Sequence, residues 1–477
     1  MASAADILAS LDSDQREVVC RWGRPMAVTA GPGTGKTRAI TARLAYGAAS
    51  GQLDPEAALA VTFTTRAAQE LRDRLSGWGV EGVQARTIHS AAWRQARHFW
   101  PRVYGCELPR LCPQPTDLLG PVVARLGWPM RPGLLRDLAQ EIAWTKQSNV
   151  LPEAYPNLAA GAGRRVAGLT ADQVVDAIAE YERAKQGQGW IDFDDILLCA
   201  AAVIESSEEA ARQLTRRYRH FVVDEFQDIS PIQSRLIDLW AGPRPDVCVV
   251  GDPAQTIHRY AGARSQYLTG FAARRGGLSL SLRQNYRSSP QILTLANALM
   301  ADHGGLTLVG RAQPGPPVQV RPAQTAEREA AELTAWLVQL AASGLDWSEM
   351  AVLYRRHGQA EPLRRALAQA GLPVAAIDPA LTRLGYGDDQ TAAGQAGVTL
   401  ATLHAAKGRQ WRAVALVGLR EGDLPHSRAS SEEDLADERR LLYVGLTRPQ
   451  EHLRLSWSQE RGGQRSMSRF LTELPLP

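Results

Sequence analysis

The stretch Ala30-Gly31-Pro32-Gly33-Thr34-Gly35-Lys36-Thr37 decides how the rest of this 477-residue chain is interpreted. Residues 26–29 before it have the pattern of a short buried strand, and a helix-forming run follows it, so its glycines lie at a strand-to-helix turn. Such a turn holds phosphate, because backbone N–H groups and a helix N-terminus face the anion. We expect Lys36 to reach the β- and γ-phosphates and Thr37 to ligate Mg²⁺. The first glycine of the strict G-x4-G-K-[ST] pattern is alanine here.

Composition and charge limit the classes of protein to consider. The chain has 54 basic and 50 acidic residues, a net charge of +4, which permits a nucleic-acid partner without arguing for one. Its five cysteines show no C-x-x-C spacing, which disfavours a zinc site and a disulfide framework. No apolar stretch approaches a membrane span, and the first residues lack the pattern of a signal peptide. We therefore expect a soluble, cytoplasmic protein of about three domain-sized units, with no membrane partner.

Strand and helix patterns alternate along two separate parts of the chain. After an amphipathic helix predicted at residues 6–22, the first part has a strand at 58–63 and returns to strands at 220–223 and 247–250. Between about residues 93 and 189 helical patterns, prolines and tryptophans replace this alternation, which predicts an inserted helical subdomain. A second α/β part runs from about residue 276 to the C-terminus and has no second phosphate loop. Its predicted strands are at 318–320, 350–354, 398–402, 413–417 and 453–457, with helices at 325–342, 359–370 and 434–446. The pattern indicates an α/β fold with parallel sheets.

Two carboxylates follow the predicted strand 220–223. Asp224 and Glu225 stand at its carboxyl end, where open α/β sheets place their ligands. We assign Asp224 to Mg²⁺, and we expect Glu225 to orient and deprotonate the attacking water. Together with the phosphate loop, this pair predicts hydrolysis of a nucleotide.

At least seven sequence blocks occur in an order that resembles the UvrD/Rep/PcrA-like family of superfamily 1 DNA helicases. The resemblance runs from Gln15 to residues 468–471. It implies two RecA-like lobes, the first formed by residues 1–92 and 190–275 and the second by residues 276–477. A helical insertion, subdomain 1B, would comprise 93–189. The family carries a large helical subdomain, 2B, before the block at Val398, and only the short loop 378–397 stands in its place here.

The resemblance also implies a set of nucleotide-binding residues. In the family, a glutamine at the position of Gln15 reads adenine, and residues matching Arg38 and Tyr286 pack on the base. Gln255 matches the residue that touches the γ-phosphate, and Arg287 and Arg448 match two arginines that approach it from the second lobe. Two such arginines make hydrolysis depend on closure of the lobes, because the charge on the transferring phosphoryl group must be neutralised. The implied ATP-binding residues are Gln15, Gly31, Gly33, Gly35, Lys36, Thr37, Arg38, Tyr286 and Gln410, with Lys36, Glu225, Gln255, Arg287 and Arg448 as the catalytic set.

A second implied set contacts DNA, through stacking on bases and contacts to phosphates. Stacking suits single strands of any sequence, at roughly 1–3 kcal/mol per base. Two departures from the family stand out. The family's tyrosine and tryptophan at the stacking block are His258 and Tyr260 here, and Gln410 replaces a carboxylate that contacts the ribose. The implied DNA-binding residues are Phe63, Thr64, Thr87, His89, His258, Tyr260, Thr402 and His404.

These observations and the resemblance together predict an ATP- and Mg²⁺-dependent translocase on single-stranded DNA that also unwinds tailed or forked duplexes. The resemblance implies that it is a 3′–5′ helicase. One alternative is a DNA-sensing ATPase subunit of a nuclease–helicase or anti-phage assembly, similar to Gabija, with little unwinding of its own. Under that interpretation a nuclease or repair protein would be a partner. A third interpretation, a nucleotide hydrolase unrelated to nucleic acid, keeps only the phosphate loop and the carboxylate pair.

Overall fold

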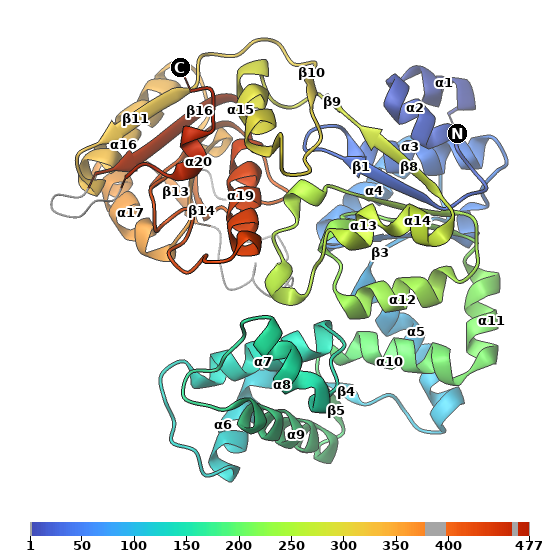
Figure 1. Cartoon of the computed structure of the whole chain (residues 1–477). Helices are drawn as coiled ribbons and strands as arrows, with labels where there is room; N and C mark the ends of the chain where they lie inside the picture. Colours follow the sequence, from blue (N-terminus) through green and yellow to red (C-terminus); the bar gives the residue numbers. More distant parts are fainter. Residues whose placement is uncertain (1, 377–396, 460–465, 477) are drawn as a thin grey trace.

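The computed structural model describes residues 2–376, 397–459 and 466–476. The expected loop 378–397 therefore lies outside the described residues, apart from Gly397. Two six-stranded sheets occupy the upper part of the molecule in Figure 1, and a group of helices lies below them. In the described residues, no helix has the length and apolar character needed to span a membrane.

The first sheet has the strand order β3-β2-β6-β7-β1-β8, and all its pairings are parallel. Its central strands are buried apolar runs, as expected for a parallel sheet with helices on both faces. The strands are β1 Met26–Ala30, β2 Ala58–Thr62, β3 Gln84–Thr87, β6 His220–Val223, β7 Val247–Gly251 and β8 Leu278–Leu282.

Helices cover both faces of this sheet, and a separate apolar core fills each side. One core is built from the N-terminal helices and the other from helices later in the chain. The first group comprises α1 Ala4–Ala9, α2 Ser13–Cys20, α3 Lys36–Ala49 and α4 Thr65–Gly77. The second comprises α5 Ile88–Tyr104, α10 Asp195–Ser206, α11 Glu208–Arg217, α12 Pro231–Ala241, α13 Gln266–Thr269 and α14 Phe271–Arg275.

The N-terminal helix is broken, although the periodicity of residues 6–22 predicts one continuous helix. The chain forms α1 and α2 instead, with a turn at Ser10–Asp12. The Asp12 side chain accepts a hydrogen bond of 2.8 Å from the backbone N–H of Gln15. An aspartate that caps a new helix competes with continuation of the preceding one, and here the cap prevails over the apolar period.

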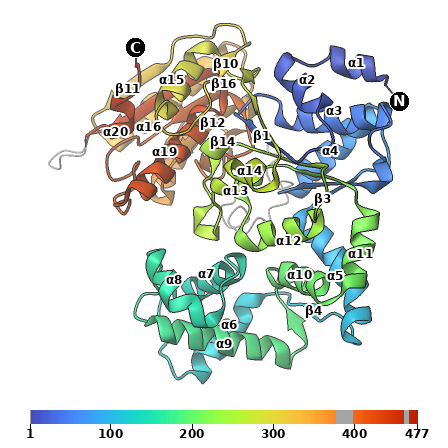
Figure 2. The ribbon, with the colours of Figure 1, turned by 45° about the vertical axis from the view of Figure 1, so that its right-hand side comes forward.

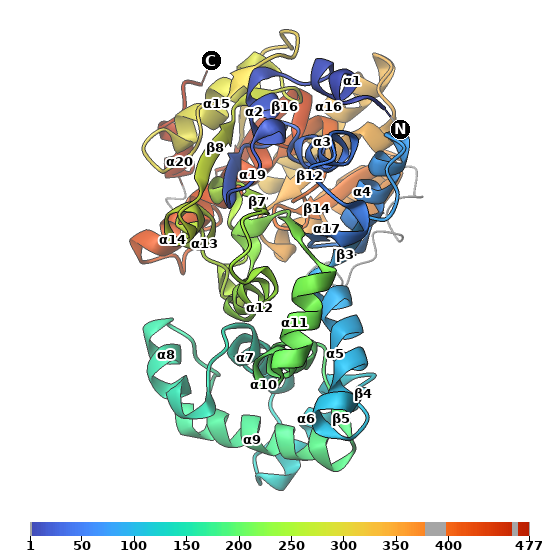
Figure 3. The same ribbon diagram turned by 90° about the vertical axis from the view of Figure 1, so that its right-hand side faces the viewer.

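The helical group below the sheets has its own core and corresponds to the insertion expected from the sequence. Figures 2 and 3 show it below the first sheet, to which α5 and α10 connect it. Its elements are β4 Arg110–Leu111, α6 Pro115–Arg125, α7 Leu134–Gln147, α8 Tyr155–Gly161, α9 Ala171–Gly187 and β5 Trp190–Ile191, where β4 and β5 form a two-stranded parallel ribbon.

The second sheet has the order β11-β16-β15-β12-β14-β13, again with parallel pairings only. Apolar cores lie on both of its faces. Its strands are β11 Gln319–Ala323, β12 Met350–Tyr354, β13 Val374–Ala376, β14 Val398–Thr402, β15 Trp411–Leu416 and β16 Pro449–Ser458. The helices are α15 Pro290–Met300, α16 Ala326–Ala342, α17 Ala360–Gln369, α19 Glu432–Leu446 and α20 Arg469–Thr472. Two parallel sheets of this kind are the two RecA-like lobes that the sequence predicts.

Strand β8 belongs to the first sheet, although it follows the expected lobe boundary at residues 275/276. It pairs along its whole length with β1, from Met26 opposite Leu278 to Ala30 opposite Leu282. The alternation of leucine and serine in β8 is typical of a half-buried edge strand. The chain then crosses to the second lobe through β9 Gln284–Asn285, which pairs with β10 Val309–Gly310.

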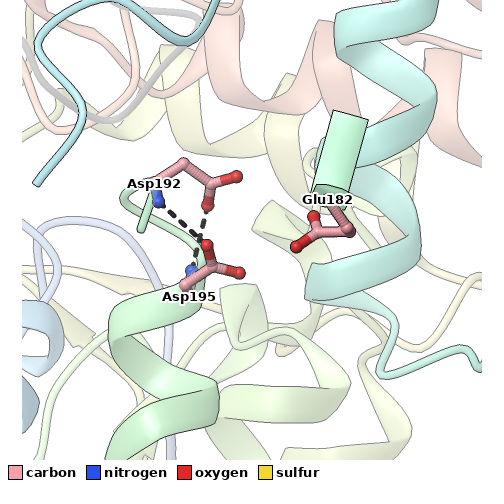
Figure 4. Close-up of side chains that lie close together, drawn as sticks. All are labelled: Glu182, Asp192 and Asp195. Carbon is pink, nitrogen blue, oxygen red and sulfur yellow. Dashed lines mark hydrogen bonds between the residues drawn. The ribbon is translucent and has the colours of Figure 1, made fainter. Parts of the chain in front are cut away.

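A buried ionic network joins the helical group to the first lobe. Glu182 of α9 and the carboxylates of Asp192 and Asp195 face one another (Figure 4), with ligand atoms within 4.8 Å of one another. Lys146 of α7 and Lys185 of α9 contact all three carboxylates, including bonds of 2.7 Å from Lys146 to Asp195 and 3.1 Å from Lys185 to Asp192. Because two ammonium groups neutralise this cluster, we interpret it as a structural ion network and not as a metal site.

Replacing Lys185 by methionine is expected to destabilise the protein by about 3–5 kcal/mol, because it leaves buried carboxylates without their counter-charge. Denaturant unfolding measures this, and Arg183→Met on the exposed face of the same helix is the matched control. Arg183 is exposed, and its buried partner Glu180 keeps a second ion pair with Arg125, so loss of Arg183 is expected to cost less than about 1 kcal/mol. Equal stability of the two variants would contradict the assignment.

Candidate nucleotide and nucleic-acid sites

The carboxyl ends of the first sheet's strands place the predicted site residues along one edge. Since all the strands are parallel, the segments that follow β1, β7 and β6 emerge side by side. These carry the phosphate loop, Gln255, and the pair Asp224 and Glu225. The segments after β2 and β3 emerge further along the same edge and carry Phe63 and Thr64, and Thr87. The nucleotide residues and the expected DNA residues thus occupy neighbouring stretches of a single edge.

The phosphate loop has the backbone that its glycines predict. Gly33 and Gly35 have φ of 72° and 78°, in the left-handed region that favours glycine. Gln15 is buried and donates from Nε2 to the carbonyl oxygen of Thr34, at 3.0 Å. A Cβ atom at Gly35 would lie 2.8 Å from Gln15 Nε2. Gln15, the residue predicted to read adenine, therefore lies against the phosphate loop.

Residues that follow the first sheet in the chain cover this loop closely. Asn285 donates from Nδ2 to the carbonyl oxygen of Pro32, at 2.6 Å. A Cβ atom at Gly33 would lie 2.6 Å from Asn285 Nδ2, and one at Gly31 would collide with Leu308. The cradle therefore depends on small residues for two reasons, the turn conformation and the approach of a second segment.

Tyr286 and Arg38 lie at the mouth of the loop. The backbone N–H of Tyr286 donates to the carbonyl oxygen of Gly33 at 2.9 Å, and its hydroxyl donates to Asp12 at 2.6 Å. The ring is 49% exposed, which leaves a face free for an aromatic base. Arg38 is exposed and donates to the carbonyl oxygen of Ser10. Both predicted base-packing residues thus lie beside the phosphate loop and the turn between α1 and α2.

The cation-binding chemistry fits the buried carboxylates after β6. Lys36 donates to the carbonyl oxygen of Ala30 at 3.1 Å. Burial, and then the charge of Glu225, raise the pKa of Asp224. Burial would also raise the pKa of Glu225, but Lys36 and Lys407 hold it below its usual value. Two adjacent buried carboxylates form a site that a divalent cation would stabilise, and Thr37 in the first turn of α3 would supply the further oxygen ligand predicted from the sequence.

Glu225 is held by a short chain of amides. It has φ of 52°, a conformation rare outside glycine. Gln227 donates from Nε2 to Glu225 Oε2 at 2.6 Å and accepts from the backbone N–H of Asp252 at 2.9 Å. Gln255 donates to the Asp252 carboxylate at 2.8 Å. The proposed water-activating carboxylate is therefore connected to Gln255, and Gln227 is a positioning residue that the sequence analysis did not single out.

The two predicted arginines approach this series of hydrogen-bonded side chains from the second lobe. Arg448 is 2% exposed, and its Nη2 donates to Gln255 Oε1 at 3.0 Å. Arg287 donates to the carbonyl oxygen of Thr447 at 3.3 Å. Burial, then the neighbouring Arg287, lower the pKa of Arg448 to about 9, and burial lowers that of Arg287 to about 10, so both stay charged at neutral pH. Two crowded guanidinium groups above a phosphate loop favour binding of a polyphosphate.

A second cross-lobe contact involves residues to which the sequence analysis gave no role. Lys407 of the second lobe forms a buried ion pair with Asp228 and donates to the backbone oxygen of Gln255, at 2.6 Å. Burial raises the pKa of Asp228 to about 6 even though Lys407 is adjacent. Both residues lie inside motif blocks, Asp228 three residues after Glu225, but nothing in their spacing shows that they meet.

Three predicted stacking residues gather beside the ends of β2 and β7. The rings of Phe63 and His258 are stacked at 6.4 Å between centroids and 12° between planes. Tyr260 lies edge-on to His258 at 5.8 Å and is 51% exposed. The pKa of His258 is lowered by burial, then by Lys407 and His404, which places His404 of the second lobe near the same group. Phe63, His258 and Tyr260 form one aromatic cluster on the first lobe, and the charges of Lys407 and His404 from the second lobe act on it.

The predicted phosphate contacts have structural partners already. Thr64 caps α4 and Thr87 caps α5, each accepting a backbone hydrogen bond of 3.1 Å, so two helix N-termini point toward this edge. Thr402 accepts from the backbone N–H of Ala405 at 3.2 Å. His89 lies differently, stacked on Phe193 at 4.1 Å.

Burial lowers the pKa of His89 to about 3, so this ring is neutral at physiological pH. A neutral imidazole stacked within the protein is a packing element, and it cannot attract a phosphate by charge. Gln410 is exposed, and its expected contact with the ribose stays a prediction.

Helix α19 connects the aromatic cluster with the arginines. At its N-terminal end Glu433, Asp434 and Asp437 surround Arg259, at 3.0, 3.5 and 3.4 Å. Arg259 stands between the two stacking residues of the first lobe. At the other end α19 leads into Arg448. One helix of the second lobe therefore contacts both predicted sites.

Comparisons with known proteins agree with this arrangement. A sequence model of the UvrD/REP helicase N-terminal domain matches residues 11–274. A model of the UvrD-like helicase C-terminal domain matches 280–380 and 379–460, two segments that meet within the stretch where the sequence analysis expects only a short loop.

Relatives with curated names are similar over most of the chain. The ATP-dependent DNA helicase UvrD2 of Mycobacterium tuberculosis is 38% identical, in an alignment that covers 99% of this chain and 82% of that protein. UvrD1 of the same organism is 30% identical, covering 78% of this chain and 50% of that protein. PcrA of Staphylococcus epidermidis is 28% identical, covering 77% and 51%. The fold, the paired sites and these matches show that the chain belongs to the UvrD/REP helicase family.

Proposed function

We propose that this protein is an ATP-dependent DNA helicase that moves along single-stranded DNA in the 3′ to 5′ direction, with ATP and Mg²⁺ bound between its lobes. The observation that carries the proposal is the hydrogen bond of 3.0 Å from Arg448 of the second lobe to Gln255 of the first. It joins the arginine that would neutralise the γ-phosphate to the segment that also bears the stacking residues His258 and Tyr260.

In this proposal each part of the site has one task. The loop amides and Lys36 hold the β- and γ-phosphates, while Gln15, Arg38 and Tyr286 border the base. Asp224 and Thr37 hold the Mg²⁺ ion, which supplies charge neutralisation at the phosphates. Glu225, oriented by Gln227, accepts a proton from the attacking water. Arg287 and Arg448 stabilise the charge that develops on the transferring phosphoryl group.

Hydrolysis is expected to depend on closure, because the catalytic groups come from both lobes. The contacts of Arg448 with Gln255 and of Lys407 with Asp228 cross between the lobes. Loss of the γ-phosphate removes the anion on which both arginines converge, and the lobes can then separate. The aromatic cluster of the first lobe is close enough to Lys407 and His404 of the second to be influenced by their charges, so a strand stacked there would experience the same change.

The proposed direction is tested by strand displacement on duplexes with a 3′ or a 5′ single-stranded tail, together with ATPase measurements with and without single-stranded DNA. We expect stimulation of ATP hydrolysis by the single strand and displacement from the 3′-tailed substrate only. Displacement from the 5′ tail alone would overturn the polarity. Failure of single-stranded DNA to stimulate hydrolysis would overturn the coupling.

The same assay addresses the role as a sensing subunit with a nuclease or repair partner. That role predicts stimulated hydrolysis without displacement by the isolated chain. The comparisons do not favour it, since the relatives described above are named as helicases in their own right.

A further inference from the structure

A polar hollow of about 480 Å³ opens between the helical group and the second lobe. Arg165 comes from the loop between α8 and α9, and Arg428 from the segment between β15 and α19, so two separate parts of the chain face each other across it. None of the nucleotide residues or aromatic-cluster residues lines it. The lining residues are Arg136, Asp137, Gln140, Glu141, Arg165, Ala167 and Arg428.

The charges around this arginine hollow are unbalanced. Glu141 is buried and already satisfied, because it accepts from Arg164 at 2.8 and 3.0 Å and from the Tyr155 hydroxyl at 3.0 Å. Asp137 lies beside Arg136, at 3.1 Å. In the part of the chain that the structure describes, neither Arg165 nor Arg428 has a carboxylate partner. Two guanidinium groups therefore face a common space that contains no unused negative charge.

The helical group that lines one side of the hollow also contacts the proposed DNA site. Arg164 donates from Nη1 to the backbone oxygen of Tyr260, at 3.3 Å, and thereby joins the helical group to the aromatic cluster. The next residue in the chain, Arg165, lines the hollow. A strand whose base stacks on the exposed ring of Tyr260 would pass the segment that carries Arg165, since Arg164 contacts Tyr260 and Arg165 follows it in the chain.

We propose that the arginine hollow binds the sugar-phosphate backbone of the DNA strand beyond Tyr260, with Arg165 and Arg428 donating hydrogen bonds to its phosphates. This inference rests on the proposed function, because it extends the path of the same strand. Guanidinium groups suit phosphates through paired, charge-assisted hydrogen bonds, and contacts of this kind carry no sequence preference. The strand would bridge the helical group and the second lobe and hold the two parts together.

Salt dependence gives the quantity to measure. Each phosphate contact on a single strand contributes about 0.7 to the slope of log affinity against log salt concentration. Loss of two contacts therefore lowers the slope by about 1.4. At about 0.1 M salt this corresponds to a loss of roughly fivefold in affinity per contact, or about 25-fold in all.

The experiment measures binding of fluorescent oligo-dT of increasing length to the full chain and to Arg165→Ala/Arg428→Ala across a range of salt concentrations. The matched control is Arg212→Ala/Arg216→Ala on α11, which removes the same charge from a helix on the far side of the first lobe (Figure 1). We expect the double variant to bind short oligonucleotides like the native chain but to lose the gain in affinity that longer ones bring. Melting temperature and ATPase activity without DNA are expected to be unchanged, since both arginines are exposed.

The outcomes separate this inference from the proposed function. A native salt slope in the Arg165/Arg428 variant, or an equal loss in the α11 control, would overturn the binding role of the hollow while leaving DNA-stimulated hydrolysis intact. Absence of DNA stimulation in the native chain would instead overturn the proposed function. If the variant loses affinity equally for all lengths, the hollow contacts the strand within the aromatic site and not beyond it, which also contradicts the proposed path.

Discussion

Replacing Arg448 by alanine is expected to lower kcat for DNA-stimulated ATP hydrolysis by about a thousandfold or more, because an arginine that neutralises the transferring phosphoryl group contributes on this scale. The side chain is almost fully buried and contacts Gln255 at 3.0 Å, so it meets the nucleotide only when the lobes are together. Steady-state kinetics with saturating single-stranded DNA measures the effect. The KM for ATP should change far less than kcat, since the contact strengthens in the transition state.

Arg448 also donates to the carbonyl oxygens of Val444 and Arg409, so truncation could loosen the fold as well as the chemistry. Arg448→Lys separates the two effects, since it keeps the charge and most of the volume but loses the planar fork. We expect a folded protein with native DNA affinity and a large loss of kcat. Arg440→Ala, at a partly exposed position in the helix that precedes Arg448, is the control and should hydrolyse ATP normally. A kcat for Arg448→Lys within about tenfold of native, with Arg448→Ala folded and equally active, would exclude the transition-state role.

Replacing Lys36 by alanine is expected to abolish ATP hydrolysis within detection, a loss of at least about a hundredfold, because no other ammonium group lies at the phosphate loop in the described residues. Lys36 contacts only loop carbonyl oxygens, at 3.1 and 3.4 Å, so its removal breaks no ion pair of the fold. Binding of single-stranded DNA without nucleotide should therefore stay close to native. The two measurements are ATP turnover and oligonucleotide affinity.

A change confined to DNA affinity, with native turnover, would contradict the role of Lys36 at the phosphates. Strand displacement supplies an independent readout, since a variant without hydrolysis should not separate a tailed duplex. Arg38→Ala, two residues further along α3 and exposed, is the matched control. It is expected to change the KM for ATP more than kcat, because it borders the base and not the phosphates.

Much of the architecture follows from the sequence, because parallel strands in a covered sheet are short apolar runs that stand out between helices. The strand at 350–354 was expected and is observed with identical bounds. The continuous helix predicted at residues 6–22 is interrupted in the structure. Capping by Asp12 is a local preference, and the spacing of the apolar residues does not reveal it. The expected boundary at residues 275/276 places residues 278–282 in the second lobe, and no strand is predicted there, because their pairing with β1 is a long-range property.

The candidate site was predictable in its parts but not in its connections. Gln15 and Arg448 could be named from motifs, and the structure places both at the nucleotide edge. The pairing of Lys407 with Asp228 joins residues 179 positions apart, and no pattern in either segment encodes it. His89 shows the opposite case, since its motif suggests a phosphate contact while its stacking depends on Phe193, in the turn between β5 and α10, which lies against it from elsewhere in the chain.

Helix α19 gives the molecule a dependence on its ionic surroundings that neither site would have alone. Its fifteen residues span about 22 Å, from the acidic cluster on Arg259 to the buried Arg448. The cluster is partly exposed, so dissolved ions screen it, whereas the buried end is shielded from them. Increasing ionic strength should therefore weaken the ion pairs between Arg259, which stands between His258 and Tyr260, and α19. Arg448 should be disturbed only at higher ionic strength. ATP hydrolysis would then continue at its basal rate but would no longer be stimulated by single-stranded DNA.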